Sequence, residues 1–265
     1  AYPFGIVNLS DSGLPADVQI KTFNPLIPGD ADASGIPIAV LRYEVSNKSD
    51  KPLTVSVCGS IRNFIGKDGS KFHYDWKGDK IYEGAVKNKN EYFEEGNLSG
   101  INFLPGEVSE DDPAWGTLTL TTDATSGISY RTSSVQNAWS NGILDFWDDF
   151  SEDGILIEKN EQVDNDPMAS LAVKQVIPGN STRTFQFFLT WHFPNRKAWS
   201  SEVVGNYYTT QYTNAKDVIF QTYPKLNNLE AKTIDFVNAF INSDLPNAVK
   251  EAALFNLSTL RTQTV

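Results

Sequence analysis

An acidic and aromatic segment, LDFWDDFSEDG (residues 144–154), is the densest group of side chains in the sequence that could do chemistry. Two carboxylates placed on either side of a glycosidic bond can hydrolyse it. Carboxylates that are neighbours in sequence seldom face each other across a substrate, which disfavours catalysis here. Trp147, Asp148 and the nearby Trp139 could instead contact a sugar. The simpler alternative is a solvated acidic loop whose aromatic side chains anchor it to the core.

In a second polar segment, DADASG (residues 30–35), Asp30, Asp32, Ser34 and Gly35 match positions 1, 3, 5 and 6 of a calcium-binding loop. Such a loop requires a bidentate Glu at its twelfth position, where this chain has Leu41. The segment also leads through Pro37 into a strand pattern, whereas a calcium loop leads into a helix. We therefore expect a polar loop between strands and no metal site.

Histidine and cysteine are too scarce for most metal or nucleophile chemistry. His73 and His192 are the only histidines and are expected to be ordinary surface or loop residues. Cys58 is the only cysteine, which excludes an intrachain disulfide, and its apolar strand context predicts a buried, inert thiol. The common motifs of hydrolases, metalloproteases and phosphate-binding loops are missing from the sequence. The sequence predicts neither a metal nor a cofactor.

Charge and hydropathy narrow the class of protein further. The 265 residues carry a net charge of −11. Nucleic acids and anionic membrane surfaces attract clusters of Lys and Arg, which this chain lacks. Its apolar runs fall short of the roughly 18 residues of a membrane helix, and its first residues lack the pattern of a signal peptide. We expect a soluble protein, compatible with the bacterial periplasm or exterior, and the opening on Ala1 suggests a piece of a larger protein.

The elements that must position these residues are mainly strands. Alternation of apolar and polar residues predicts six of them, parted by Gly, Pro, Asn and Asp and not by helices. They cover residues 37–47, 53–61, 116–122, 127–133, 170–176 and 183–191. We expect the first two to form one hairpin and the last two another. This pattern favours a large antiparallel β-sandwich, because a parallel sheet would need crossover helices.

The hydrophobic period changes from two to that of a helix at about Asn214. Apolar residues from Leu229 to Ile241 follow one face of an amphipathic helix. A second helix is predicted after SDLP (residues 243–246), with apolar residues on more than one side, which is typical of a helix between neighbours. We therefore divide the chain into a sandwich domain, residues 1–213, and a helical part, residues 214–265.

The segment between the last strand and the first helix (residues 190–213) is unusually aromatic. Such density on a connection suggests a surface on which another domain packs, with core filling and a ligand site as alternatives. The interface candidates, two of them from the last helix, are Trp191, Pro194, Trp199, Tyr207, Tyr208, Tyr212, Leu254 and Phe255.

Several segments, taken in order, resemble the N-terminal domain of glycoside hydrolase family 116, which contains non-lysosomal glucosylceramidases and bacterial β-glucosidases. FNPLIPGDADASGIPIAVLRYEVSN (residues 23–47) has its prolines, Ser34 and Asn47 in matching places. PGNSTRTFQFFLTWHFPN (residues 178–195), followed by a Tyr-rich entry into helix, resembles another family segment. LPNAVKEAALFNLSTLRTQTV (residues 245–265) resembles the first helix of the family's catalytic barrel.

The resemblance implies a β-sandwich whose C-terminal linker helices begin an (α/α)6 barrel. In the family that barrel carries the Glu nucleophile and the Asp acid/base of a retaining mechanism, and neither has a counterpart in this sequence. The implied function is a non-catalytic domain that caps and braces the barrel of an enzyme acting on β-glucosides. Two alternatives remain open. One is a stand-alone carbohydrate-binding module, and the other is the sandwich of a glucoamylase-like or disaccharide-phosphorylase-like enzyme.

Overall fold

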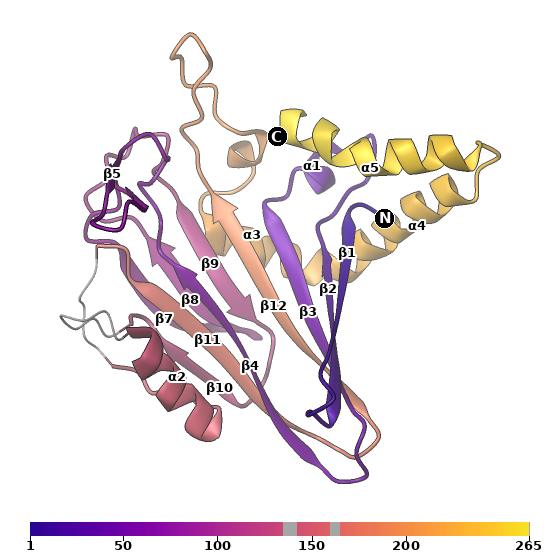
Figure 1. The fold of residues 1–265 in the computed structure, drawn as a ribbon. Coiled ribbons are helices and arrows are strands. Elements are labelled where there is room, and N and C mark those ends of the chain that lie inside the picture. The colour runs from indigo at the N-terminus through magenta and orange to yellow at the C-terminus, as the bar shows by residue number, and fades with distance from the viewer. Residues whose placement is uncertain (135–141, 160–164, 265) are drawn as a thin grey trace.

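Two antiparallel sheets form the body of the molecule (Figure 1). The computed structural model describes residues 1–134, 142–159 and 165–264. The larger sheet has seven strands, in the order β1 (Phe4–Ser10), β2 (Ala16–Phe23), β3 (Ile38–Asn47), β12 (Thr182–His192), β9 (Thr117–Thr122), β8 (Leu98–Leu104) and β7 (Lys89–Glu95). The smaller sheet has the order β10 (Ile128–Arg131), β11 (Met168–Ile177) and β4 (Leu53–Arg62).

A single apolar core fills the space between the two sheets. Phe103, Phe185 and Phe187 of the larger sheet belong to the same buried cluster as Leu171 and Ile177 of the smaller one. Phe185 and Phe187 lie on the face of β12 that its alternating apolar residues predict, whereas β8 and most of β11 are buried on both faces. The prediction of antiparallel β-structure followed by C-terminal helices is confirmed.

Both predicted hairpins are wrong, although all four of their strands exist. β3 belongs to the larger sheet and β4 to the smaller one, and the same is true of β12 and β11. The connections at 48–52 and 178–181 carry the chain from one sheet to the other. The reason is that both arrangements give the same sequence pattern. Two strands joined by a polar turn bury the same alternating residues whether they pair in one sheet or pack face to face from two sheets.

The buried side chain of Asn47 holds these two connections together. Its amide nitrogen donates to the carbonyl oxygens of Lys51 at 2.8 Å, Ile177 at 3.1 Å and Pro178 at 3.1 Å. Its amide oxygen accepts from the backbone N–H of Ser49 at 3.0 Å. Asn47 therefore satisfies backbone groups of both sheet-to-sheet connections, which an apolar residue of similar size could not do.

Helices cover the outer face of the seven-stranded sheet, so its central strands are buried on both faces. The C-terminal elements are the 3₁₀ turns η1 (Tyr207–Thr210) and η2 (Tyr223–Lys225) and the helices α3 (Ala215–Thr222), α4 (Leu226–Ile241) and α5 (Asn247–Thr264). Val218 and Ile219 of α3 and Leu229 of α4 share a buried cluster with Val40 and Phe188 of the sheet. Among the described residues no helix is long and apolar enough to cross a lipid bilayer.

Threonine hydroxyls fix the start of α3 on the sheet. Thr190 donates to the carbonyl oxygen of Ala215 at 2.7 Å, and the N–H of Ala215 donates to the hydroxyl of Thr117 at 2.8 Å.

A bidentate ion pair holds α4 in place, with Arg42 of β3 2.5 and 2.8 Å from the two carboxylate oxygens of Glu230. The predicted helical part thus begins on the sheet itself, and the division at residue 213 stays a proposal.

We predict that Asn47→Ala lowers the free energy of unfolding by about 2–4 kcal/mol, because buried carbonyl groups lose their donor. Urea-induced unfolding measures the change. The matched control is Asn8→Ala, since Asn8 is exposed on β1, where its side chain accepts from the side-chain amide of Gln19 at 2.6 Å. It should change stability by no more than about 0.5 kcal/mol. Equal effects of the two substitutions would contradict the assigned role of Asn47.

Candidate functional site

The aromatic segment at 190–213 divides into residues that fill the core and residues that face solvent. Tyr208 and Tyr212 are buried in the cluster between the sheet and the helices. Trp191 is half-buried and packs against that cluster and the one between the sheets. Pro194 is half-buried as well, and Leu254 of α5 is buried. The four candidates from the segment anchor it, and these four and Leu254 are buried or half-buried.

Hydrogen bonds lock the buried anchors in place. The hydroxyl of Tyr208 accepts from the N–H of Phe193 at 3.2 Å and from the side-chain amide of Asn206 at 3.0 Å. The ring of Tyr208 meets His192 edge-on at 5.8 Å. Burial raises the pKa of Tyr208, which therefore stays neutral at physiological pH. The turn into η1 is thus a rigid base for the loop that precedes it.

Three of the candidates face solvent: Trp199, Tyr207 and Phe255. Trp199 lies in the loop at 195–205 and is 100% exposed, and Phe255 of α5 is 78% exposed. The side chain of Asn195 donates to the carbonyl oxygens of Glu110 at 2.6 Å and Asp112 at 3.0 Å, which fixes the base of the loop. Figure 1 shows this loop projecting from the end of the molecule where β12 ends.

The DADASG segment lies beside η1 and forms the short helix α1 (Ala31–Ser34), not the loop that the sequence predicted. The carboxylate of Asp30 caps this helix by accepting from the N–H of Ala33 at 2.9 Å. The carboxylate of Asp32 accepts from the hydroxyl of Tyr207 at 2.6 Å and from the side chain of Gln211 at 2.7 Å. Both acidic residues are therefore engaged in local contacts. No cluster of described His, Cys, Asp or Glu side chains could hold a metal ion.

A small hairpin that the sequence did not single out adds to the exposed aromatic surface. It comprises β5 (Phe72–Tyr74) and β6 (Lys80–Tyr82), which pair only with each other. Trp76 at its tip is 89% exposed. The other exposed apolar side chains are Phe72, Tyr74, Ile81 and Tyr82. Figure 1 places this hairpin at the same end of the molecule as the loop at 195–205. The alternation of Phe72, Tyr74 and Trp76 was the available signal.

The acidic segment is a helix, α2 (Gly142–Asp153), and not the predicted loop. The reason is that Asp145 and Asp149, four residues apart, share one helical face and both bind the buried Arg131 of β10, each at 2.6 Å. Burial of Asp145 opposes its ionisation, but Lys159 and Arg131 outweigh it and lower the pKa. A catalytic general acid requires a raised pKa, so Asp145 is suited to a structural role and not to that of the acid in glycoside hydrolysis.

Two of the three sugar-contact candidates, Trp147 and Asp148, lie in the part of the chain that the structure describes. Trp139 lies outside the described residues. Trp147 is 60% exposed on α2, and Asp148 next to it is exposed as well. Trp147 therefore does not anchor the segment to the core. In Figure 1, α2 lies beside the smaller sheet, well separated from the loop at 195–205.

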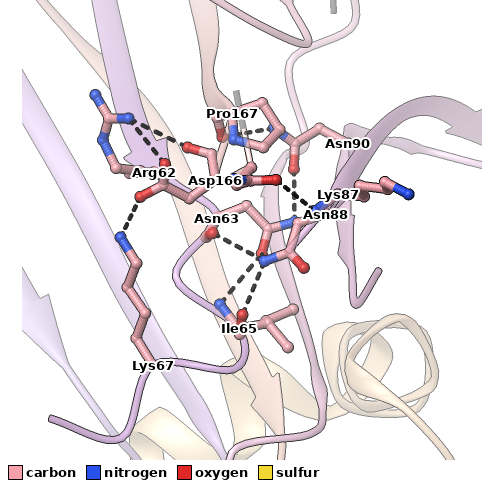
Figure 2. A network of polar contacts seen from close by, with 10 residues as sticks. Arg62, Asn63, Ile65, Lys67, Lys87, Asn88, Asn90, Asp166 and Pro167 are labelled. Carbon is pink, nitrogen blue, oxygen red and sulfur yellow. Dashed lines mark hydrogen bonds and ion pairs between the residues drawn. The ribbon is translucent and has the colours of Figure 1, made fainter. Parts of the chain in front are cut away.

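A polar hollow of about 230 Å³ lies next to a network of buried asparagines (Figure 2). The Asn88 side chain donates to the carbonyl oxygen of Ile65 at 2.8 Å and to both oxygens of Asn63 at 3.1 Å. Asn90 donates to the carbonyl oxygens of Thr132 at 2.8 Å and Pro167 at 2.9 Å. These amide donors are engaged within the protein, so the network joins the sheets and leaves few free groups for a ligand.

The two histidines differ, and the expectation for His192 is wrong. His73 is exposed and lies 2.6 Å from a carboxylate oxygen of Glu83. His192 is buried at the end of β12, where its Nε2 lies 2.9 Å from the carbonyl oxygen of Tyr212. Burial lowers the pKa of His192, against the opposing effect of this hydrogen bond. Cys58 is half-buried on β4, and burial raises the pKa of its thiol to about 11.

We predict that His192 makes stability depend on pH. The unfolded imidazole takes up a proton near pH 6.5, but the folded one does so only at lower pH. The unfolded state therefore binds more protons between the two values, and the free energy of unfolding falls as pH falls below about 6.5. His192→Gln keeps a donor and does not titrate, so its stability should depend less on pH. Unfolding by urea at several pH values tests this, with His73→Gln as the control; an unchanged slope in His192→Gln would contradict it.

No curated protein sequence gives a significant match to the chain. A candidate kojibiose phosphorylase from the human microbiome is similar at 14% identity and TM-score 0.38, over 89% of this chain and 23% of its own. A polysaccharide lyase is similar at 10% identity and TM-score 0.38, over 72% of this chain and 22% of its own. The chain thus spans about a quarter of the length of these two structures.

The family comparison gives a match over most of the sequence. The model described as "beta-glucosidase 2, glycosyl-hydrolase family 116 N-term" matches residues 1–229, from the first strand into α4. The matched part contains both sheets, the asparagine residues between them and the loop that carries Trp199. This protein therefore belongs to the family of glycosyl-hydrolase family 116 N-terminal domains.

Proposed function

We propose that this chain is the non-catalytic N-terminal domain of a retaining β-glucosidase- or glucosylceramidase-like hydrolase, and that it braces the (α/α)6 catalytic barrel of the same polypeptide. The observation that carries the proposal is a set of exposed aromatic side chains on two neighbouring projections of a family 116 domain, the loop at 195–205 and the β5–β6 hairpin, which lie at the same end of the molecule. We call this set the aromatic end, and it comprises Trp199 and the aromatic residues of the β5–β6 hairpin. Tyr207 of η1 and Phe255 of α5 are further exposed aromatic side chains. Large exposed aromatic residues are typical of protein contact sites.

The support of the aromatic end is rigid, as an interdomain contact requires. Asn195 fixes the base of the loop at 195–205, and Tyr208 is locked beneath it. A partner could bind Trp199 without the cost of ordering the whole segment, since its base is already held. Burying a large aromatic side chain would add about 25 cal/mol for each Å² of apolar area covered.

Helix α5 is the proposed beginning of the catalytic barrel. Its side chains Val249 and Phe255 are exposed, whereas Leu254 is buried. A helix with apolar residues on more than one side is typically packed between neighbours, as each helix of an (α/α)6 barrel is. The family match ends at residue 229, so this assignment rests on the pattern of α5 and its resemblance to the family's first barrel helix.

The two alternatives from the sequence have less support. A stand-alone carbohydrate-binding module would use Trp147, which is exposed on a helix and not at the aromatic end. The sandwich of a glucoamylase-like or phosphorylase-like enzyme would share the general architecture. The family match over residues 1–229 favours family 116 over that alternative.

We predict that the 265-residue chain does not hydrolyse an aryl β-glucoside. The family's Glu nucleophile and Asp acid/base have no counterpart in this sequence, and Asp145 and Asp149 are both engaged in ion pairs with Arg131. The measurement is release of the coloured aglycone, with the buffer blank as the reference. Turnover that follows the protein through purification would overturn the non-catalytic assignment.

We predict that Trp199→Ala weakens binding of this chain to the separately expressed catalytic domain of its polypeptide. Removing an aromatic residue at the centre of an interface costs about 2 kcal/mol, or roughly 30-fold in affinity. Titration calorimetry measures the affinity directly. Trp147→Ala is a matched control, because it also removes an exposed tryptophan, and should leave binding unchanged.

Other outcomes would count against the interdomain role. Equal affinity of Trp199→Ala and the unmodified chain would exclude Trp199 from the contact. Cellobiose or laminarin could instead cause a saturable change in tryptophan fluorescence. Loss of that change in Trp147→Ala, with no measurable binding to the catalytic domain, would favour the carbohydrate-binding module.

A further inference from the structure

The two edges of the seven-stranded sheet differ sharply in charge. At one edge, β7 has the sequence KNEYFEE, and four of its seven residues are charged. At the other edge, β1 has the sequence FGIVNLS, with no charged residue and no proline. Charged side chains and proline are the usual means by which proteins protect an edge strand from pairing with another chain. The edge at β7 is protected in this way, and the edge at β1 is not.

β1 is also well ordered and accessible, as a strand that accepts a partner must be. It pairs with β2 along its whole length, from Phe4 opposite Phe23 to Ser10 opposite Asp17. The rings of Phe4 and Phe23 stack at 5.7 Å, which anchors the start of the strand. The remaining residues of β1 are exposed, including the apolar Ile6, Val7 and Leu9. In Figure 1, β1 lies at the outer side of the sheet, opposite the smaller sheet.

We propose that β1 pairs with β1 of a second copy of this chain, so that two seven-stranded sheets join across a twofold axis. Antiparallel pairing centred on Val7 sets the register. Val7 then faces its own copy, and Ile6 faces Asn8. Gly5 would face Leu9, and Phe4 would face Ser10, so each of these large side chains lies opposite a small one. Residues directly opposite each other lie on the same face of a sheet, so the two pairs fit side by side.

The electrostatics of β1 suit a second copy in particular. A twofold axis brings each residue near its own equivalent, so any charge at the centre of the strand would repel itself. β1 has none. A groove of about 270 Å³ beside the strand is lined by Ile6 and by Ile234 and Val237 of α4, and it continues the apolar surface next to the edge.

The contact is small, so the dimer should dissociate on dilution. One pair of strands buries less than the roughly 1,200 Å² of a standard stable interface. Sedimentation velocity over a wide range of concentrations tests this. We expect the mass to rise from that of one chain, 29.4 kDa, towards that of two.

Val7→Lys is the decisive variant. It places two lysines opposite each other at the proposed axis and should weaken dimerisation at least tenfold. Val7 is 52% exposed, so the folded chain tolerates the longer side chain. Val176→Lys is the matched control, because Val176 is 57% exposed on β11 of the smaller sheet, and it should dimerise like the unmodified chain.

Three results would overturn the proposal. The first is a monomer at every concentration. The second is a dimer that Val7→Lys leaves unchanged, which would place the contact elsewhere. The third is protection of the outward β1 amides from hydrogen exchange in a monomeric, longer form of the polypeptide, which would show that another segment of the same molecule covers the edge. None of these results depends on binding to a catalytic domain, so they are separate from the test of the interdomain role.

Discussion

The rest of the structure depends on one constraint. Where the chain passes from one sheet to the other, its buried backbone N–H and C=O groups need hydrogen-bond partners. Such groups have no strand partner at these places, and leaving them without hydrogen bonds would be costly. Three buried asparagines supply the partners. Asn47 joins two of the connections, and Asn63 and Asn88 stand at the two ends of a third, from β4 to β7. An asparagine suits this position because one side chain both donates and accepts.

Once the sheets are joined, the larger one becomes a middle layer with a core on each side. Phe187 contributes to the core between the sheets, and its neighbour Phe188 contributes to the core beneath the helices. The strand β12 therefore serves both cores, and its end at His192 leads directly into the aromatic segment. The buried residues of that segment belong to the second core, which leaves Trp199 free to project from a fixed base.

The charged residues serve the fold in the same way. Arg131 is buried and binds two carboxylates of α2, and Arg42 binds Glu230 of α4. Leaving a buried guanidinium unpaired would be strongly destabilising, so each of these acidic residues has a structural reason to be where it is. These ion pairs therefore hold α2 against the smaller sheet and α4 against the larger one.

Sequence alone determined six of the strands (β3, β4, β9, β10, β11 and β12), the last two long helices and the family resemblance, and it missed the strands β1, β2 and β5 to β8. The alternation in β12 and the helical spacing from Leu229 to Ile241 are local patterns, which can be recognised from neighbouring residues alone. The tertiary structure decided that the predicted hairpin partners lie in opposite sheets, that Tyr208 is buried while Trp199 is exposed, and that α2 is a helix bound to Arg131. Each of these outcomes depends on residues distant in sequence, because an apolar or charged side chain does not itself specify which distant element will cover it.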